Sequence, residues 1–308
     1  MFTRRQFIQS SAVLAAGAVM SHYVPSVQAE YKTCVKKAIL GGIPSEAQME
    51  QWLKWGIEGM EITGGITREQ AEATRKSADK TGFRIHSVMG GGSPERIELA
   101  AAMGCDGVLL VPGRVSGMPM PQPWEFKIQF NDKTNELISV VEGDNEPYKA
   151  YIEAHNKAME GARKHVESLI PVAEKNNIVI CLENVWNNMW VQPKFAANFI
   201  QSFKHPNVKA YFDIGNHVKY ANPLEWFDLM PNDIFKVHLK DFKLNDNGQG
   251  GRFAKLMEGS VDWRKIRDKM EEVGYNGWMS VELEGCPLPI EEQGRRMGLI
   301  ASGQPLVL

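Results

Sequence analysis

The sequence has few cysteines and no excess of basic residues. Its 308 residues include four cysteines, which are far apart and form no Cys-x-x-Cys pair. A dense disulfide framework is therefore not predicted. The 35 lysines and arginines are balanced by 37 aspartates and glutamates, so the charge gives no reason to expect DNA, RNA or an anionic membrane surface as a partner.

The sequence also lacks the glycine motif of dinucleotide-binding proteins. The turn after the first expected strand contains no G-x-G-x-x-G, which disfavours a doubly wound sheet. Short apolar runs instead alternate about eight times with amphipathic stretches. Runs such as 178–182 are apolar on both faces, as are parallel strands that helices cover. The pattern predicts an α/β fold of the (β/α)8 TIM barrel type.

The bounds of the expected elements follow from this alternation and from helix caps. Strands are expected at 37–41, 59–63, 84–88, 107–111, 178–183, 209–213, 235–238 and 278–282. The clearest helices are expected at 45–55, 67–81, 94–102, 148–176, 193–203, 223–230 and 262–273.

Residues 113–147, which follow the fourth expected strand, interrupt the alternation. A loop rich in Pro, Gly and Met precedes two alternating runs, FKIQF and LISVV, on either side of a polar turn. Two such runs indicate a β-hairpin. Because it follows the C-terminal end of a barrel strand, the insertion is expected to be a lid or a contact in a homo-oligomer. The alternative is an insertion without a function.

Residues 1–29 are predicted to be a Tat export signal that is removed from the mature protein. Arg4 and Arg5 precede a weakly apolar stretch at 12–20, and small residues lead to a cleavage site near Ala29. The apolar stretch is too short to span a bilayer. The mature chain, 30–308, is therefore expected in the periplasm as one barrel domain without a membrane anchor.

Four ligand-capable side chains lie at the ends of four expected strands. They are Glu183, Asp213, His238 and Glu282. The C-terminal ends of barrel strands share one face, so the four side chains are expected to meet there. Three carboxylates and one imidazole suit a hard or borderline divalent cation. We predict one such ion, with Mn²⁺ preferred over Mg²⁺, Co²⁺ or Zn²⁺; the competing interpretation is four separate ion-paired residues.

Other polar side chains near the strand ends are candidates for substrate binding. Glu61 and His86 come from the second and third expected strands, and each is as readily explained as a satisfied structural group. Arg252 lies in a glycine-rich loop, where it could reach a substrate oxygen or simply remain solvated. Lys240 could neutralise a negatively charged intermediate, or it could pair with Asp241 or Glu282.

The segments around the last four strand ends resemble the xylose isomerase-like TIM barrels. From about residue 37 to residue 284, order and spacing match: CLENVW at the fifth strand, FDIGNH at the sixth, KVHLKD at the seventh and SVELEG at the eighth. A Gly-x-Val-Asp-Trp-x-x-Ile motif occupies 259–266. The family includes sugar phosphate isomerases and epimerases and hydroxypyruvate isomerase.

The resemblance implies that Glu183, Asp213, His238 and Glu282 coordinate one divalent metal. It also implies that Glu183 and Glu282 are the catalytic acid and base. Such a pair removes a proton next to a carbonyl, giving an enediolate, and then returns the proton.

The chain departs from the family pattern after the fifth and sixth strands. Asn216 stands where epimerases commonly have a histidine, and the imidazole comes one residue later, at His217. Met189 stands where ketose epimerases often have a substrate-binding carboxylate. Trp186 suits a carbohydrate, because an indole ring stacks on C–H faces. Trp186, Asn216 and His217 are therefore expected to contact the substrate, which the differences suggest is not a free ketose.

Together these features predict a divalent-metal-dependent sugar isomerase or epimerase that acts through an enediolate. Export favours an unphosphorylated small carbohydrate, because sugar phosphates are scarce outside the cytoplasm. One alternative is a lyase that abstracts the α-proton of a 3-keto-glycoside and then eliminates the aglycone. A second alternative is a non-catalytic periplasmic sugar-binding protein, which would not require two glutamates beside the metal.

Overall fold

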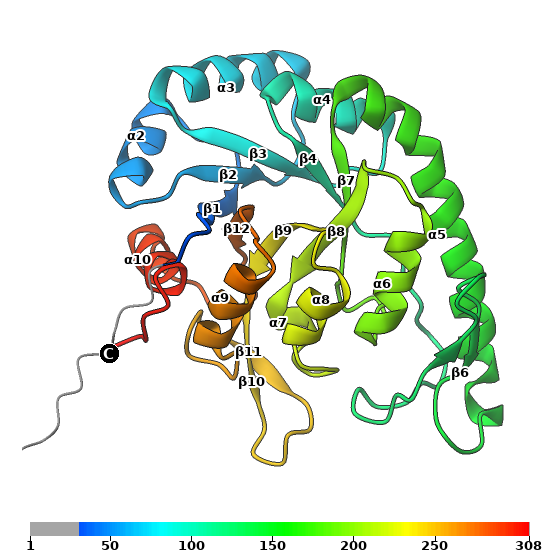
Figure 1. Ribbon diagram of the computed structural model, residues 1–308. Helices are drawn as coiled ribbons and strands as arrows, with labels where there is room; N and C mark the ends of the chain where they lie inside the picture. Colours follow the sequence, from blue (N-terminus) through cyan, green and yellow to red (C-terminus); the bar gives the residue numbers. More distant parts are fainter. Residues whose placement is uncertain (1–30, 308) are drawn as a thin grey trace, which may run out of the picture.

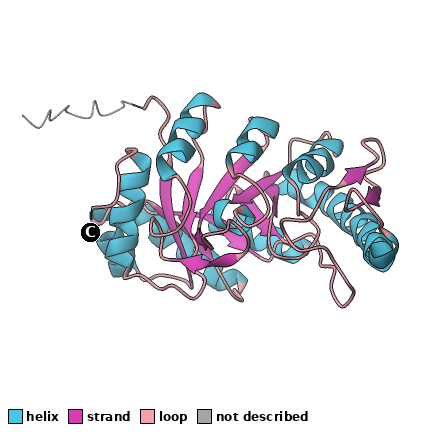
Figure 2. Cartoon of the chain, turned by 90° about the horizontal axis from the view of Figure 1, so that it is seen from below, coloured by secondary structure: helices cyan, strands magenta, loops and turns pink. Residues whose placement is uncertain are grey.

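The computed structural model describes residues 31–307 and contains a closed parallel barrel surrounded by helices (Figures 1 and 2). The predicted export signal at 1–29 lies outside the described residues. The barrel order is β1-β12-β9-β8-β7-β4-β3-β2, which confirms the predicted (β/α)8 TIM barrel. Its strands are β1 (Lys36–Gly41), β2 (Gly59–Ile62), β3 (Arg84–Met89), β4 (Gly107–Leu110), β7 (Val179–Glu183), β8 (Val208–Asp213), β9 (Ile234–Leu239) and β12 (Trp278–Val281). Two antiparallel pairs lie outside it: β5 (Gln129–Phe130) with β6 (Leu137–Ser139), and β10 (Asp241–Leu244) with β11 (Gly251–Ala254).

The helices begin where the sequence provides caps. Ser45 and Thr67 each form a capping box with the glutamine three residues later, and Pro94 opens the next helix. Within 31–307, no helix has the length and apolar character needed to cross a membrane. The helices are α2 (Glu46–Lys54), α3 (Arg68–Thr81), α4 (Pro94–Met103), the 3-10 helix η1 (Glu146–Tyr148), α5 (Lys149–Asn176), α6 (Pro193–Ser202), α7 (Ile214–His217), α8 (Leu224–Leu229), α9 (Trp263–Glu272) and α10 (Ile290–Ala301).

Every strand and helix predicted for the barrel lies within one residue of its expected bounds. The sequence did not lead us to expect α7, α10 or the β10–β11 pair. The β10–β11 pair projects from the barrel as a long hairpin (Figure 1). Only Lys240 separates the end of β9 from the start of β10. The sequence of β10 was therefore indistinguishable from the loop that follows a barrel strand.

The insertion at 113–147 packs against α5 and the loop after β7. Its two paired strands are much shorter than the alternating runs in the sequence. Asn156 of α5 accepts the Leu137 N–H at 2.7 Å and donates to the Leu137 carbonyl at 3.0 Å. The Val115 N–H donates to Asn187 O at 2.9 Å. A role as a lid or an oligomer contact stays a prediction.

The barrel interior contains a layer of buried polar side chains. Apolar side chains fill the space between the barrel and its helices instead. Each side chain of the polar layer belongs to a residue at most 2% exposed, and within the layer His86 Nδ1 is the one polar side-chain atom without a hydrogen-bond partner among residues 31–307. The layer consists of Glu61, His86, Ser87, Tyr211, His238 and Ser280.

One buried aspartate fixes the junction between β9 and β10. Asp241 Oδ1 accepts the N–H groups of Phe242 (2.8 Å) and Val261 (3.3 Å). Its Oδ2 accepts the Gly259 N–H (3.1 Å) and Trp263 Nε1–H (2.9 Å). These bonds attach the hairpin to the Gly-x-Val-Asp-Trp segment and explain why glycine and tryptophan occur there.

Replacing Gly259 by alanine is expected to lower the free energy of unfolding by about 1–3 kcal/mol. A Cβ at this position would overlap Asp241 Oδ1 and crowd Phe242 O. Urea denaturation measures the change. Gly42→Ala is the matched control, because no atom lies within 4 Å of a Cβ placed there. Equal stability of the two variants would contradict this account of the junction.

Candidate metal centre

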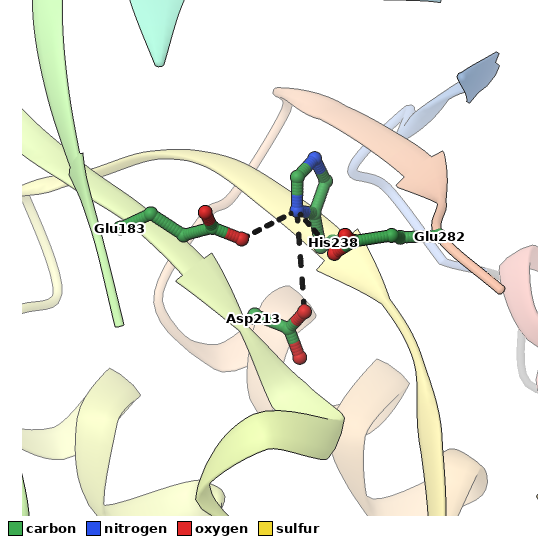
Figure 3. A group of neighbouring side chains, drawn as sticks. All are labelled: Glu183, Asp213, His238 and Glu282. Carbon is green, nitrogen blue, oxygen red and sulfur yellow. Dashed lines mark hydrogen bonds and ion pairs between the residues drawn. The ribbon is translucent and has the colours of Figure 1, made fainter. Parts of the chain in front are cut away.

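Four side chains converge at the C-terminal end of the barrel (Figure 3). Glu183 ends β7, Asp213 ends β8, His238 is the penultimate residue of β9, and Glu282 directly follows β12. These strands are neighbours in the barrel. One ligand atom of each side chain lies within 4.8 Å of the others. The structure thus brings together the four side chains that the sequence singled out, and we call them the ligand group.

His238 is central to the ligand group. Its Nδ1 is 2.9 Å from Glu183 Oε1, 3.2 Å from Glu282 Oε2 and 4.0 Å from Asp213 Oδ2. Glu183 and Glu282 approach it from opposite sides (Figure 3). The side chains of His238 and Asp213 are fully buried, whereas that of Glu282 is 20% exposed. A small molecule would therefore reach the ligand group beside Glu282.

Hydrogen bonds to neighbouring groups occupy only one of the two carboxylate oxygens of Asp213. Asp213 caps α7, and its Oδ1 accepts the Asn216 N–H at 2.8 Å. Asn184 accepts the Asp213 N–H and donates to the Asp213 carbonyl, both at 2.8 Å. Oδ2 of Asp213 and Oε2 of Glu282 are buried and make no hydrogen bond of normal geometry. Both oxygens face positively charged neighbours, which is the environment that a cation at this position would share. Asn184 was not predicted from the sequence.

Lys240 places its ammonium group beside the same two oxygens. Its Nζ lies 2.9 Å from Glu282 Oε2 and 3.2 Å from Asp213 Oδ2. Burial opposes its charge, but the carboxylates of Asp213 and Glu282 outweigh burial and raise the pKa of Lys240 above its usual value. Lys240 therefore stays charged. Of the two partners left open by the sequence, the structure selects Glu282 and not Asp241.

The three carboxylates of the ligand group carry more negative charge than His238 and Lys240 can compensate. Burial raises the pKa of Asp213 to about 7 and also raises the pKa of Glu183. Burial acts in the same direction on Glu282, but His238 and Lys240 outweigh it and lower the pKa of that carboxyl. Burial disfavours the charged form of His238, yet Glu61 and Glu282 raise its pKa well above the usual value. A divalent cation would supply the missing positive charge, and the donor set suits one.

The partly buried Trp186 ring packs among protein groups, and its contact with a substrate stays a prediction. Phe253 stacks on the Trp186 ring, with 4.6 Å between centroids, and Lys219 Nζ lies 3.4 Å from the centroid. The indole Nε1–H donates to Asn216 O at 2.7 Å. Protein groups therefore already engage the ring, which holds the β10–β11 hairpin beside α7. Phe253, whose centroid is 5.2 Å from Lys240 Nζ, was missed because the hairpin was not predicted.

Glu61 and His86 do not lie where a substrate contact was expected. Both belong to the buried polar layer, with residue exposures of 0% and 2%. Glu61 Oε2 is 2.7 Å from Nε2 of His238, the ring nitrogen that does not face the ligand group. His86 stacks on Trp278 with 4.5 Å between centroids and bonds Ser280 Oγ at 2.9 Å. Neither residue contributes appreciably to the accessible surface at which a substrate would arrive.

Within residues 31–307, neither His217 nor Arg252 makes a hydrogen bond or ion pair with the ligand group. His217 is 1% exposed and packs edge-on against Trp226, and burial lowers its pKa to about 3. It is therefore a neutral core histidine. Arg252 is exposed on β11, opposite Lys243 of β10. Of the expected substrate contacts, Asn216 and Lys240 remain beside the ligands, with Asn216 Oδ1 accepting from Lys240 Nζ at 3.4 Å.

Comparison with known proteins places these observations in a family context. The family model described as xylose isomerase-like TIM barrel matches residues 49–298. An uncharacterized protein of Methanocaldococcus jannaschii is 28% identical over 123 residues, which cover 38% of this chain and 41% of that protein. A solved D-tagatose 3-epimerase-like protein is similar over 85% of this chain and 95% of its own, with a TM-score of 0.62 and 18% identity. The 3-keto-D-glucoside 4-epimerase of E. coli is similar over 86% of this chain and 98% of its own, with a TM-score of 0.60 and 15% identity.

Proposed function

Because this chain belongs to the xylose isomerase-like TIM barrel family, we propose that it is a divalent-metal-dependent isomerase or epimerase of a small carbohydrate. The observation that carries the proposal is the placement of Glu183 and Glu282 on opposite sides of one ligand group (Figure 3). Holding a sugar does not require this arrangement, whereas moving a proton between the two faces of a carbon does. Similarity to two epimerase-type structures supports the same function.

The metal would be held by Glu183, Asp213, His238 and Glu282. Mn²⁺ is our first choice, and Mg²⁺, Co²⁺ and Zn²⁺ suit the same donors. When bound, the cation supplies a Lewis acid that draws electron density from a carbonyl and a neighbouring hydroxyl. Asp213 Oδ2 and Glu282 Oε2, which make no hydrogen bond of normal geometry and already attract the Lys240 ammonium, support a site of this kind.

The two glutamates would act as base and acid. One removes the proton from the carbon next to the carbonyl, which leaves an enediolate. If the other returns the proton to the opposite face, the carbon is inverted; if the proton goes to the adjacent carbon, an aldose and a ketose exchange. Lys240, beside Glu282, would neutralise the negative charge that develops on the substrate oxygen. Asn216 would bind a hydroxyl with its amide.

We further propose that the protein is exported and acts on an unphosphorylated sugar in the periplasm. The twin arginine at Arg4 and Arg5 and the small residues near Ala29 support Tat export. A protein that crosses the membrane folded can load its metal beforehand.

A lyase acting on 3-keto-glycosides is the second candidate. It shares the first step, removal of the α-proton, and then eliminates the aglycone instead of returning the proton. Two observations favour the 3-keto-glycoside substrate that such a lyase requires: Met189, which stands where ketose epimerases often carry a carboxylate, is fully buried, and the fold is similar to that of a 3-keto-D-glucoside 4-epimerase.

Incubation with Mn²⁺ and candidate sugars in deuterated water tests the proposal. An epimerase or isomerase incorporates deuterium at one carbon and yields an isomeric sugar. A lyase instead releases a new alcohol from the glycoside. Tight binding without exchange or release, across free sugars and 3-keto-glycosides, would identify a non-catalytic sugar-binding protein and overturn the proposal.

A further inference from the structure

His238 is bonded at both of its ring nitrogens. Nδ1 faces Glu183 and Glu282 in the ligand group. On the other side of the ring, Nε2 lies 2.7 Å from Glu61 Oε2. The side chains of Glu61 and His238 are both 0% exposed. This pairing excludes water, and Glu61 contributes nothing to the accessible surface beside Glu282.

Two hydroxyl groups fix the orientation of Glu61. Ser87 Oγ donates to Glu61 Oε1 at 2.8 Å, and Tyr211 OH donates to Glu61 Oε2 at 2.9 Å. Ser87 lies on the neighbouring strand β3, whereas Tyr211 lies on β8, across the barrel from β2. The Tyr211 ring also packs on the His238 ring, with 4.2 Å between centroids. Glu61 is therefore held from both sides of the barrel interior.

The hydrogen bonds of Glu61 determine which nitrogen of His238 carries a proton. A carboxylate that accepts hydroxyl donors at both oxygens can only accept from a third group as well. Nε2 of His238 must then be the donor. In the neutral ring, Nδ1 therefore has the lone pair, and it points at Glu183 and Glu282. Positive charge must therefore lie between Nδ1 and the two carboxylates, supplied either by a proton on Nδ1 in the charged ring or by a bound cation.

We propose that Glu61 is a positioning residue that holds His238 in the Nε2–H tautomer and directs Nδ1 at the metal. The inference rests on the proposed metal centre. Carboxylates that accept the second N–H of a metal-binding histidine orient the ring and increase its basicity as a ligand. Glu61 has the contacts and the burial needed for this role. The barrel thus supplies a ligand from β9 and its support from β2.

Glu61→Leu is expected to weaken Mn²⁺ binding by about 10–100-fold, as measured by isothermal titration calorimetry. Glu61→Gln is expected to fall between wild type and Glu61→Leu, because an amide oxygen still accepts from Nε2–H but carries no charge. Glu58→Gln is the matched control: it lies three residues earlier, its side chain is 42% exposed, and Mn²⁺ affinity should not change. Wild-type affinity in Glu61→Leu and Glu61→Gln would overturn the inference.

Nitrogen NMR of ¹⁵N-histidine-labelled, Zn²⁺-loaded protein gives a readout that is independent of activity and does not require Glu61→Leu to fold. In wild type, the His238 proton should be found on Nε2, and in Glu61→Gln this signal should broaden or shift. A proton on Nδ1 in loaded wild type would contradict the proposal. If wild type binds neither Mn²⁺ nor Zn²⁺, the metal centre itself is wrong, and this inference fails with it.

Discussion

Replacing Glu183 by glutamine is expected to lower kcat by at least about 1,000-fold on any sugar that wild type converts. The substitution removes a metal ligand and one of the two groups that exchange the proton, and general acid–base catalysis alone contributes about 100- to 10,000-fold. Glutamine has nearly the same size, so the barrel should remain folded. Deuterium incorporation measured by NMR reports the rate, and circular dichroism reports the fold.

Glu284→Gln is the matched control for Glu183→Gln. Glu284 lies two residues past Glu282, its side chain is 61% exposed, and its carboxylate is 4.0 Å from Lys240 Nζ. It therefore shares the neighbourhood without belonging to the ligand group. Its kcat should stay within about 3-fold of wild type, the range expected of an exposed charge. Substantial turnover by Glu183→Gln would exclude that side chain as a catalytic base.

Replacing Lys240 by methionine is expected to lower kcat by about 100- to 1,000-fold while the protein still binds one metal ion. Removal of one group that stabilises a developing oxyanion typically costs this much. Methionine keeps the apolar stem, which matters because the Lys240 side chain is 5% exposed. Steady-state kinetics on the metal-loaded protein measures the effect, and the decrease should fall mainly on kcat.

Lys243→Met serves as the control for this second substitution. Lys243 is exposed on β10, and in the strand register it lies opposite Arg252 of β11. It carries the same charge three residues after Lys240, on the hairpin itself, and its side chain is exposed. If both lysine variants lost activity equally, the effect would belong to the hairpin and not to the ammonium beside Glu282.

The barrel and the convergence of the ligand group could be predicted because each depends on local pattern and strand order. Glu183, Asp213 and His238 come at or near the ends of apolar runs, and parallel strands in a barrel must bring such ends together. Glu282 completes the set from the first residue after β12.

The depth of the other inward-facing side chains could not be predicted. Glu61 and His86 also lie on barrel strands, but the stagger between strands decides whether a side chain reaches the mouth or stays inside. That stagger depends on the closed sheet as a whole, for example on the pairing of Glu61 with Ser87 after a register shift in β2. The same side chain that resembled a substrate contact is therefore a partner of His238.

The surroundings of Trp186 were unpredictable for a different reason. Its ring is engaged by Phe253 and Lys219, which come from elements far away in sequence. The hairpin that carries Phe253 has a short turn containing Asn247 and Gly248, a pair that favours tight turns. This signal was present in the sequence, but the run of glycines around it indicated a loop.

Elemental analysis of the purified protein tests the central claim most directly, because every proposed role depends on one cation in the ligand group. We expect about one divalent metal ion per chain in wild type after loading with Mn²⁺ and removal of excess metal. We also expect that the double variant Asp213→Asn, His238→Ala retains no divalent metal ion after the same treatment. A folded wild-type protein that keeps no metal, or a double variant that keeps as much as wild type, would contradict the account.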